Sequence, residues 1–381
     1  MTDKTRTMEE KYKQVCKIIL NAGGTPVPLN DTLLEIIKRI ILEDEVDFIM
    51  AFKDKNSQTI DQLKASSGLN EDQIVKITDK LARKGVIFNQ PSSKGLKIYR
   101  LLPLMNVGVF EYMFMKKLDY TRENREIGRL FSKLFKEQKM EIQESYDKVL
   151  STMDKLPAVD RTVPIRVNKP TGNTTVIQIN KSFEPTEEIL QTQNVADLIE
   201  KFDEIAVGHC FCRQHRDVVE ESCKQTDLRE CCFTFGKSAR FTSTQGFMRM
   251  IDKKEALKIL LKAEEDGLVH KAYHPNFDVT KDETSVCNCC KCCCINSVVN
   301  QKEPIINAAG FLAQVDPDTC IGCGECEDHC YSDAITLTED SIAAVDETRC
   351  IGCGACAHLC PVDAIRLIES RRIVRIALPK Q

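Results

Sequence analysis

The first hundred residues show apolar positions at helical spacing, interrupted by turn residues. Residues 30–54 carry apolar side chains three and four positions apart, which predicts an amphipathic helical stretch. Two shorter helices follow, because Thr59 and Asn70 each precede a glutamine by three residues, the pattern of a capping box. Gly68 ends the first of these helices and Gly85 ends the second. The pattern therefore predicts consecutive helices before residue 86.

A hairpin is predicted directly after these helices. Short apolar runs at 86–88 and 97–102 flank a turn at 91–95 that contains proline and glycine. The order of three helices and a hairpin, over roughly residues 30–103, resembles a winged-helix domain. The resemblance is one of element pattern, and fold alone does not assign a function.

The rest of the chain alternates between helical and extended patterns. Residues 105–155 predict helices, residues 162–180 predict a hairpin, and residues 193–204 predict a helix. Asp252 begins a further helix as an N-cap, and that helix ends at Gly267. Helices and strands are thus interleaved, which predicts an α+β fold.

Composition narrows the class of protein. The 381-residue chain is 42% hydrophobic and 29% charged with a formal net charge of −4, which excludes a strongly basic nucleic-acid coat. The sequence has no run of about 18 uncharged apolar residues, the minimum for a membrane-spanning helix. Its first ten residues lack the apolar segment of a secretory signal. We therefore expect no membrane insertion and a cytoplasmic location.

The 20 cysteines carry the strongest chemical signal in the sequence. All but Cys16 fall between residues 210 and 360, in tight clusters that include directly adjacent cysteines. A secreted disulfide scaffold is usually a small domain with cysteines spread along it. This distribution therefore favours metal ligation in a reducing compartment. Cys16 lies in an apolar helical run and is expected to be a core residue.

An internal repeat lies near the C-terminus. Residues 315–337 and 345–367 are offset by 30 positions and are identical at 13 of 23. Each copy spaces its cysteines C-x2-C-x2-C-x3-C, so three thiolates can wrap one [4Fe–4S] cluster while the fourth is displaced. Zinc motifs usually present two separated pairs instead. The two copies predict a pseudo-twofold unit whose halves pack on each other.

The repeat resembles the bacterial two-cluster [4Fe–4S] ferredoxin, over about residues 312–369. In that family the fourth cysteine of each motif binds the cluster of the other motif. The resemblance implies that the ligands of one cluster are Cys320, Cys323, Cys326 and Cys360. It implies that the ligands of the second cluster are Cys350, Cys353, Cys356 and Cys330. Pro361 follows the second motif as in the family, whereas Tyr331 takes that place after the first.

A second group of cysteines lies upstream and could close on one metal centre. The four ligands that we favour are Cys210, Cys212, Cys223 and Cys232. Cys231 is a rival for the last place, and Arg213 and Lys237 could partly neutralise an anionic cluster. Thiolates suit both an iron–sulfur cluster and a mononuclear zinc ion, which His209 or His215 could join. Both interpretations stay open.

A third group places six cysteines within eight residues, too many for one regular tetrahedral site. Its members are Cys287, Cys289, Cys290, Cys292, Cys293 and Cys294. We expect a cluster here, or more than one centre shared with the second group. The alternative is a thiol-rich loop that uses only some of these ligands. Together, the two groups resemble those of larger iron–sulfur proteins of anaerobes, which have a winged-helix-like start and a two-cluster ferredoxin end.

These features divide the chain into four predicted regions of an α+β protein. Residues 1–105 form a winged-helix-like domain, and residues 106–205 form a connecting region of helices and a hairpin. Residues 206–300 form a cysteine-rich α+β metal-binding region, and residues 305–381 form the two-cluster ferredoxin domain. The expected cofactors are two [4Fe–4S] clusters in the last region and one or more further iron–sulfur clusters in the third.

The leading functional hypothesis is single-electron transfer between redox partner proteins, because such clusters change oxidation state without binding substrate. No Rossmann, P-loop or nucleophile-elbow motif is present, so an electron carrier or oxidoreductase subunit is expected rather than a stand-alone enzyme. Docking of the partners is assigned to the N-terminal region and to the basic C-terminal residues Arg371, Arg372, Arg375 and Lys380.

Two alternatives remain. Lys76, Lys80 and Arg83 share a helix face, and residues 59–100 hold eight Lys or Arg against four Asp or Glu. A redox-responsive transcription regulator would use such a face on DNA, but this modest excess also suits an ordinary solvated helix, so DNA is the less favoured partner. The second alternative is an oxidoreductase subunit whose cluster at residues 287–294 binds substrate through an open iron.

Overall fold

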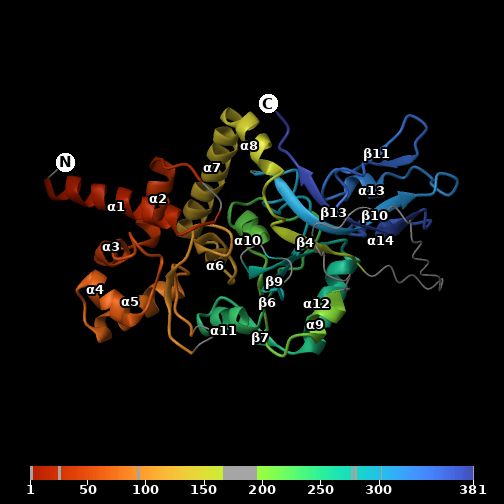
Figure 1. The fold of residues 1–381 in the computed structure, drawn as a ribbon. Helices are drawn as coiled ribbons and strands as arrows, with labels where there is room; N and C mark the ends of the chain where they lie inside the picture. Colours follow the sequence, from red (N-terminus) through yellow and green to blue (C-terminus); the bar gives the residue numbers. More distant parts are fainter. Residues whose placement is uncertain are drawn as a thin grey trace. The chain divides into compact units, whose positions relative to one another are not determined.

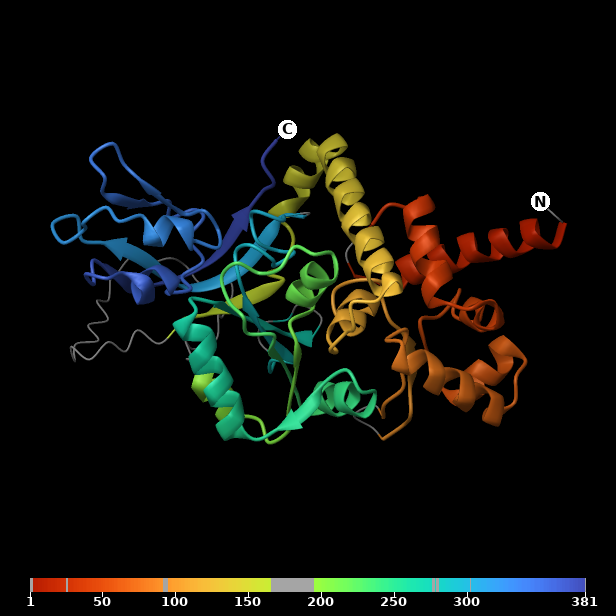
Figure 2. The ribbon, with the colours of Figure 1, turned by 180° about the vertical axis from the view of Figure 1, so that it is seen from behind.

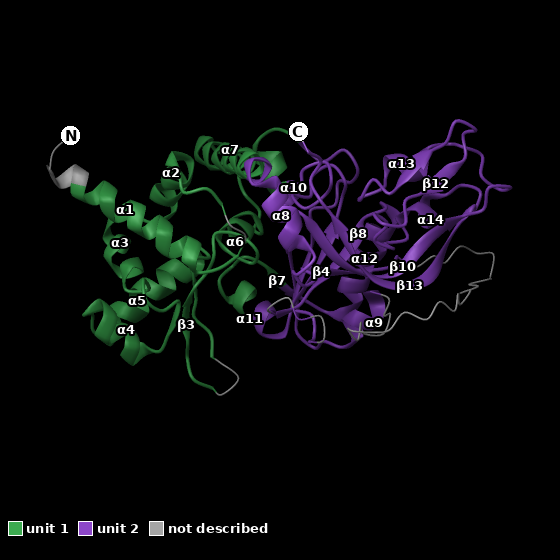
Figure 3. Ribbon diagram, turned by 45° about the horizontal axis from the view of Figure 1, so that its top comes forward, with its two compact units in different colours: residues 1–141, 214–221, 241–249 green, residues 142–213, 222–240, 250–381 purple. Residues whose placement is uncertain are grey.

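Two compact units make up the chain in the computed structural model (Figure 3). Unit 1 comprises residues 1–141, 214–221 and 241–249, and unit 2 comprises residues 142–213, 222–240 and 250–381. The structure describes residues 3–24, 27–91, 95–165, 195–275, 278, 281–301 and 303–380. Each unit combines helices with strands, which confirms the predicted mixture of helix and sheet.

Unit 1 begins with five helices and a small antiparallel sheet (Figure 1). The helices are α1 (Asp3–Asn21), α2 (Asp31–Ile40), α3 (Glu43–Met50), α4 (Ile60–Ser67) and α5 (Glu71–Arg83). The strands are β1 (Ser57–Gln58), β2 (Ile87–Phe88) and β3 (Tyr99–Leu101), in the order β1-β3-β2. Thr59 and Asn70 form the capping boxes of α4 and α5, as predicted. Strands β2 and β3 pair antiparallel, as the predicted hairpin requires.

Aromatic rings surround a buried histidine in unit 1. The helices that supply them are α6 (Val109–Phe114) and α7 (Arg122–Glu144). The His215 ring centre lies 5.5, 5.2 and 5.8 Å from those of Phe110, Phe114 and Phe135. Its Nε2 atom lies 2.9 Å from the backbone oxygen of Gly128. Burial lowers the pKa of His215 to about 4, so the ring is neutral in the folded protein at neutral pH.

We expect unit 1 to become less stable as the pH is lowered, because His215 is buried in its neutral form. The unfolded pKa of a histidine is about 6.5, above the folded value of about 4. Between these values the unfolded chain binds the extra proton, so stability is lost as the pH falls, by about 3 kcal/mol at most. A His215→Gln variant should lack this loss when urea unfolding is compared with wild type across that pH range. An equal loss in the variant would contradict the assignment.

The core of unit 2 is an eight-stranded mixed sheet, in the order β13-β10-β4-β8-β9-β6-β5-β7. Its strands are β4 (Asp160–Val163), β5 (Ile205–His209), β6 (Glu230–Phe235), β7 (Arg249–Ile251), β8 (Val269–Tyr273), β9 (Ser285–Cys289), β10 (Ile305–Val315) and β13 (Ile365–Ile376). Strands β4 and β10 are parallel, whereas β5, β6, β9 and β8 pair antiparallel in succession. This succession brings segments from residues 205 to 289 side by side.

Helices pack against this sheet and complete its core. Unit 2 contains α8 (Tyr146–Met153), α9 (Val195–Glu200) and α12 (Lys253–Glu265), whereas α10 (Phe211–Val218) and α11 (Gly236–Thr244) have residues in both units. Helices α9 and α12 lie side by side (Figure 2), and Leu198 and Leu260 share a buried cluster with Phe233 and Val286. Asp252 caps α12 through a hydrogen bond from the Glu255 amide, as predicted.

The C-terminal cysteine repeat is joined to the sheet through two long strands. Strand β10 pairs antiparallel with β13, from Ile305 opposite Ile376 to Val315 opposite Ile365. The elements between these strands are α13 (Glu325–Asp328), β11 (Ile335–Leu337), β12 (Ala343–Val345) and α14 (Ala355–Leu359). The repeat and the sheet therefore belong to one unit.

Some predicted elements differ from the structure or fall outside it. The helical region at 105–155 is three helices, α6 to α8. The hairpin predicted at 162–180 lies mostly outside the described residues, and β4 is the described strand at its start. Within the described part of the chain, every helix is too short or too polar to cross a membrane.

Candidate metal centres

Two cavities lie among the cysteines of the C-terminal repeat, each lined by four of them. The cysteines around the first, of about 330 Å³, are Cys320, Cys323, Cys326 and Cys360. The cysteines around the second, also of about 330 Å³, are Cys330, Cys350, Cys353 and Cys356. The fourth cysteine of each motif thus faces the cavity of the other motif, the grouping that the ferredoxin resemblance implies.

Backbone amides point at sulfur in both copies of the repeat. The amide of Ala334 donates a hydrogen bond to Cys330 Sγ at 3.2 Å. The amide of Ala364, 30 positions later, donates to Cys360 Sγ at 3.3 Å. Such N–H donors offset the negative charge of thiolate-bound iron, and hydrogen bonds to sulfur are one of the factors that set cluster potentials. The donor set therefore fits one [4Fe–4S] cluster in each cavity.

Glycine is required where the chain closes around each cavity. Gly322 and Gly352 both have φ of +66°, a conformation that other residues rarely adopt. A Cβ atom at Gly322 would lie 2.2 Å from the backbone oxygen of Ser341, and one at Gly352 would lie 2.1 Å from that of Phe311. The loops that carry the first cysteines of each motif are therefore packed too tightly for a side chain.

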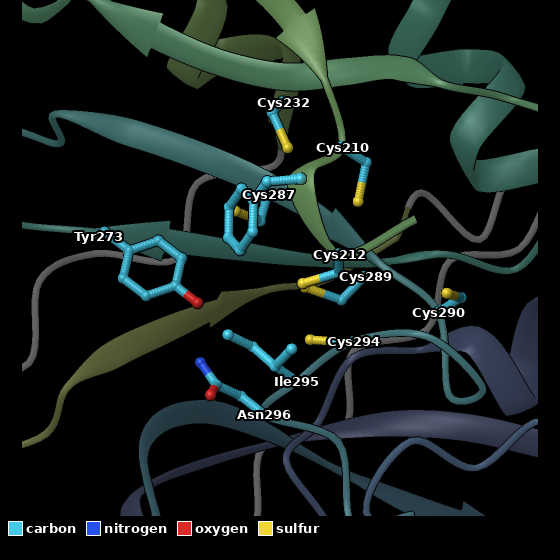
Figure 4. Close-up of a pocket in the computed structure, with 11 residues that line it drawn as sticks. Cys210, Cys212, Cys232, Tyr273, Cys287, Cys289, Cys290, Cys294, Ile295 and Asn296 are labelled. Carbon is cyan, nitrogen blue, oxygen red and sulfur yellow. The ribbon is translucent and has the colours of Figure 1, made fainter. Parts of the chain in front are cut away.

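A third cavity, of about 320 Å³, lies among the middle cysteines (Figure 4). Six thiols surround it in a closed ring in which each interacts with the next. In ring order they are Cys210, Cys212, Cys294, Cys289, Cys287 and Cys232. We call this set the six-cysteine ring. Like each cavity of the repeat, this cavity is lined by at least the four cysteines that one [4Fe–4S] cluster takes.

Strand geometry explains which cysteines face this cavity. Successive residues of a strand point to opposite faces, so Cys287 and Cys289 of β9 point the same way. On β6, Cys232 lines the cavity, while Cys231 accepts a hydrogen bond from Arg213 at 3.4 Å. The pairing of Phe233 with Val286 places Cys232 beside Cys287 on the neighbouring strand. The alternation of the strand therefore selects Cys232 over its rival Cys231.

A second set of thiols is separate from the ring. Cys223, Cys290, Cys292 and Cys293 have sulfur atoms that all lie within 4.8 Å of one another, and we call them the four-cysteine group. Cys290 also borders the third cavity, but it lies to one side of the ring in Figure 4. The grouping of Cys223 with Cys210, Cys212 and Cys232, favoured from the sequence, is therefore wrong. The loop that carries Cys223 meets Cys290 and Cys292 instead.

Hydrogen bonds between thiols prepare several sulfurs to ionise. In the ring, donation from Cys212 is the main cause that lowers the pKa of Cys210 and of Cys294. In the four-cysteine group, the hydrogen bond between Cys223 and Cys290 is the main cause that lowers the pKa of Cys223 to about 6. Thiolates are the form that binds iron and zinc. Each set contains some thiols with a lowered pKa, beside others, such as Cys212 and Cys290, whose pKa is raised.

Two buried cations border the ring. Arg213 has no exposed surface and donates to the backbone oxygens of Leu228, at 3.1 Å, and of Asn288. Lys271 lies 2.6 Å from Asp160, and its ammonium group lies 5.2 Å from the centre of the Tyr331 ring. Burial alone would lower the pKa of Lys271, but Asp160 and nearby thiolates outweigh burial and raise it. Both cations offset negative charge at the ring.

Tyr331 connects the six-cysteine ring with the C-terminal repeat. Its hydroxyl lies 3.2 Å from Cys294 Sγ, and its side chain is 1% exposed. In the sequence it directly follows Cys330, which lines the second cavity of the repeat. Lys291, beside the four-cysteine group, adds an ion pair to Asp333 at 2.9 Å. The residue that departs from the ferredoxin pattern is therefore the one that contacts the neighbouring cysteine site.

Several residues that the sequence analysis assigned to docking or to metal binding have other partners in the structure. The C-terminal arginines bind within unit 2, since Arg372 donates to the backbone oxygen of Cys350 and Arg375 to that of Leu156. They are thus partly used inside the fold rather than free for docking. Lys237 is exposed. The ring of His215 contacts Gly128 and Ser132 of unit 1, so it is not placed as a metal ligand.

Two residues at the site carried no signal in the sequence. Lys271 and Asp160 are 111 positions apart, and neither belongs to a sequence motif that would have singled it out. Only the pairing of β4 with β8 brings them together in the interior. The role of Asn288 also had no signal in the sequence, where it lies between Cys287 and Cys289. In the structure its side chain lies 2.5 Å from Nδ1 of His270. His270 is thus held by a polar partner in the interior.

Comparison with known proteins found a match for one part of the chain. A family model described as a 4Fe-4S dicluster domain matches residues 313–367. No match was found among the curated proteins or among the solved structures. The matched segment contains both cavities of the repeat. The chain therefore ends in a ferredoxin-type 4Fe-4S domain, and this domain together with the cysteine-rich region points to iron–sulfur electron transfer.

Proposed function

We propose that the protein is an electron carrier that holds a third iron–sulfur cluster in the six-cysteine ring, close to the two clusters of its ferredoxin-type domain. One observation carries the proposal: three cavities, each lined by at least four cysteines, lie within unit 2. Clusters bound there would supply single-electron transfer at low potential. The donor and acceptor would be other redox proteins.

The residues between the ring and the repeat support transfer between these sites. Tyr331 is buried, its hydroxyl contacts Cys294 of the ring, and its chain neighbour Cys330 lines the second cavity of the repeat. Lys271 and Arg213 place positive charge beside the thiolates of the ring. A buried cation near a cluster stabilises its more negative, reduced state, since Coulomb interactions are strong where water is excluded.

The structure favours an electron carrier over the two alternative functions, an oxidoreductase subunit with a substrate-binding cluster and a DNA-binding regulator. A cubane needs four thiolates, and six surround the third cavity, so each iron can have a protein ligand and none need be open to substrate. In unit 1, Lys80 lies 3.0 Å from Glu45 and 3.3 Å from Asp44. These ion pairs neutralise part of the basic stripe on which DNA binding depends.

Metal analysis of anaerobically purified protein tests the proposal. Three cubanes predict about twelve irons and as many acid-labile sulfides per chain, whereas two predict about eight. Stepwise reduction followed by electron paramagnetic resonance should show a third signal that broadens through coupling to its neighbour. A count of eight or fewer irons would remove the third cluster. A colourless preparation that holds zinc alone would overturn the whole proposal.

A further inference from the structure

We propose that the four-cysteine group binds a single zinc ion, as a site separate from the iron–sulfur centres. The sulfur of Cys223 lies 3.8 Å from that of Cys290 and 3.6 Å from that of Cys292. The sulfurs of Cys292 and Cys293 are 3.6 Å apart. A tetrahedral zinc ion with Zn–S bonds of about 2.3 Å places its sulfur ligands about 3.8 Å from one another. The spacing of this group therefore matches one ion.

The same spacing excludes a cubane at this group. A cubane holds irons and sulfides between its thiolates, so its ligands must stand well apart. Across the part of the chain that the structure describes, this is the one set of three or more metal-ligating side chains whose ligand atoms all lie within 4.8 Å of one another. The cysteine sets around the two cavities of the repeat are wider, and so is the six-cysteine ring. The sulfur atoms of the four-cysteine group are therefore closer together than those of the sites in the same protein that fit a [4Fe–4S] cluster.

Ligand chemistry favours zinc over iron for this single ion. A closed shell of four thiolates is typical of structural zinc sites. For a given set of ligands, zinc(II) also binds more tightly than iron(II). The complex would carry a net negative charge, and the backbone amides of Lys224 and Gln225 point at Cys292 and Cys223 to offset it. Arg213 adds a positive charge near Cys290.

The position of the group indicates what the ion would do. Cys290 to Cys293 lie between Cys289 and Cys294, which both belong to the six-cysteine ring. An ion that ties this loop to Cys223 would fix the direction in which those two ring ligands point. Asn300 supports the same loop through its side-chain amide, which donates to the backbone oxygen of Cys292 at 2.8 Å. Zinc does not change oxidation state in proteins, so the ion would order the cluster site without storing electrons.

X-ray absorption at the zinc edge of the anaerobic full-length protein tests the inference. We expect about one zinc per chain with four sulfur neighbours at about 2.3 Å and no iron in the next shell. A Cys223→Ala variant should lose this zinc, because Cys223 belongs to the group and not to the ring. A Cys231→Ala variant is the matched control, since Cys231 is buried nearby but belongs to neither set, and it should keep the zinc.

Cobalt(II) provides a second readout that does not depend on iron content. Protein produced with cobalt in place of zinc should show the intense visible absorption of a tetrahedral four-thiolate cobalt site, and Cys223→Ala should abolish it. The inference is overturned if zinc is absent, if iron occupies the group, or if Cys223→Ala keeps its zinc. These outcomes leave the iron count of the ring untouched, so this inference and the proposed electron carrier can fail separately.

Discussion

A Cys294→Ala variant is expected to lose the iron of the third cluster and to keep about eight irons per chain in the ferredoxin-type domain. Cys294 contacts Cys212 and Cys289 in the ring, and these contacts and the Tyr331 hydroxyl lower its pKa. It is therefore among the ring sulfurs best prepared to bind metal as a thiolate. Alanine is used because a serine oxygen could still act as a ligand. Iron analysis and electron paramagnetic resonance of the reduced protein measure the loss.

The control for this variant is Cys231→Ala. Cys231 is as buried as Cys294 and is adjacent to the ring ligand Cys232, and its thiol contacts Arg213 and Cys210, but it does not line the cavity. We expect it to retain all the iron of the wild type. Equal iron in Cys294→Ala and wild type would show that the ring does not need Cys294. Equal loss in both variants would show only a general effect of removing a buried thiol.

An Asp160→Asn variant is expected to lose about 3–5 kcal/mol of unfolding free energy, the cost of leaving one partner of a buried ion pair without the other. Asp160 and Lys271 are 2.6 Å apart, and their side chains are 5% and 1% exposed. Without the carboxylate, the ammonium group of Lys271 stays in the interior with only the Tyr331 ring and nearby thiolates to stabilise it. Urea unfolding of anaerobic protein, followed through the transition of unit 2, measures the effect.

The same Asp-to-Asn substitution at an exposed ion pair is the control. It distinguishes the loss of the buried ion pair from a general effect of the substitution. Asp147 lies 3.6 Å from Lys380 in the same unit, and its side chain is 87% exposed. Asp147→Asn should cost no more than about 1 kcal/mol, as is usual for exposed pairs. An Asp160→Asn, Lys271→Met double variant should regain much of the lost stability, because it removes the unpaired charge. A stable Asp160→Asn single variant would contradict the argument.

Local patterns predicted much of the fold. The capping boxes at Thr59 and Asn70 act within four residues, so the start of each helix follows from the sequence alone. The same holds for the N-cap at Asp252. The structure also groups the cysteines of the repeat as the ferredoxin resemblance implies. The C-x2-C-x2-C spacing sets the first three of each group over a few residues, whereas the fourth comes from the other copy. The winged-helix resemblance and the four predicted regions remain predictions.

The middle cysteines show where sequence reasoning stops. Their identity as metal ligands follows from their number and clustering, but their partners lie up to 82 positions away along the chain, as with Cys212 and Cys294. The register of β6 against β9 places Cys232 beside Cys287, and a loop contact places Cys223 beside Cys290. Neither contact is visible as a local pattern in the sequence. The spacing of the cysteines along the chain therefore could not distinguish the six-cysteine ring from the four-cysteine group.

The sequence by itself determined that the protein binds metal through cysteine and that its C-terminal repeat has the ligands of a two-cluster domain. The tertiary structure alone decided that ten of the twelve cysteines outside the repeat form a ring of six and a group of four, and that Tyr331 links the ring to the repeat. The physical reason is the range of the interactions. Capping and motif spacing act between near neighbours, whereas strand register and burial depend on the whole fold.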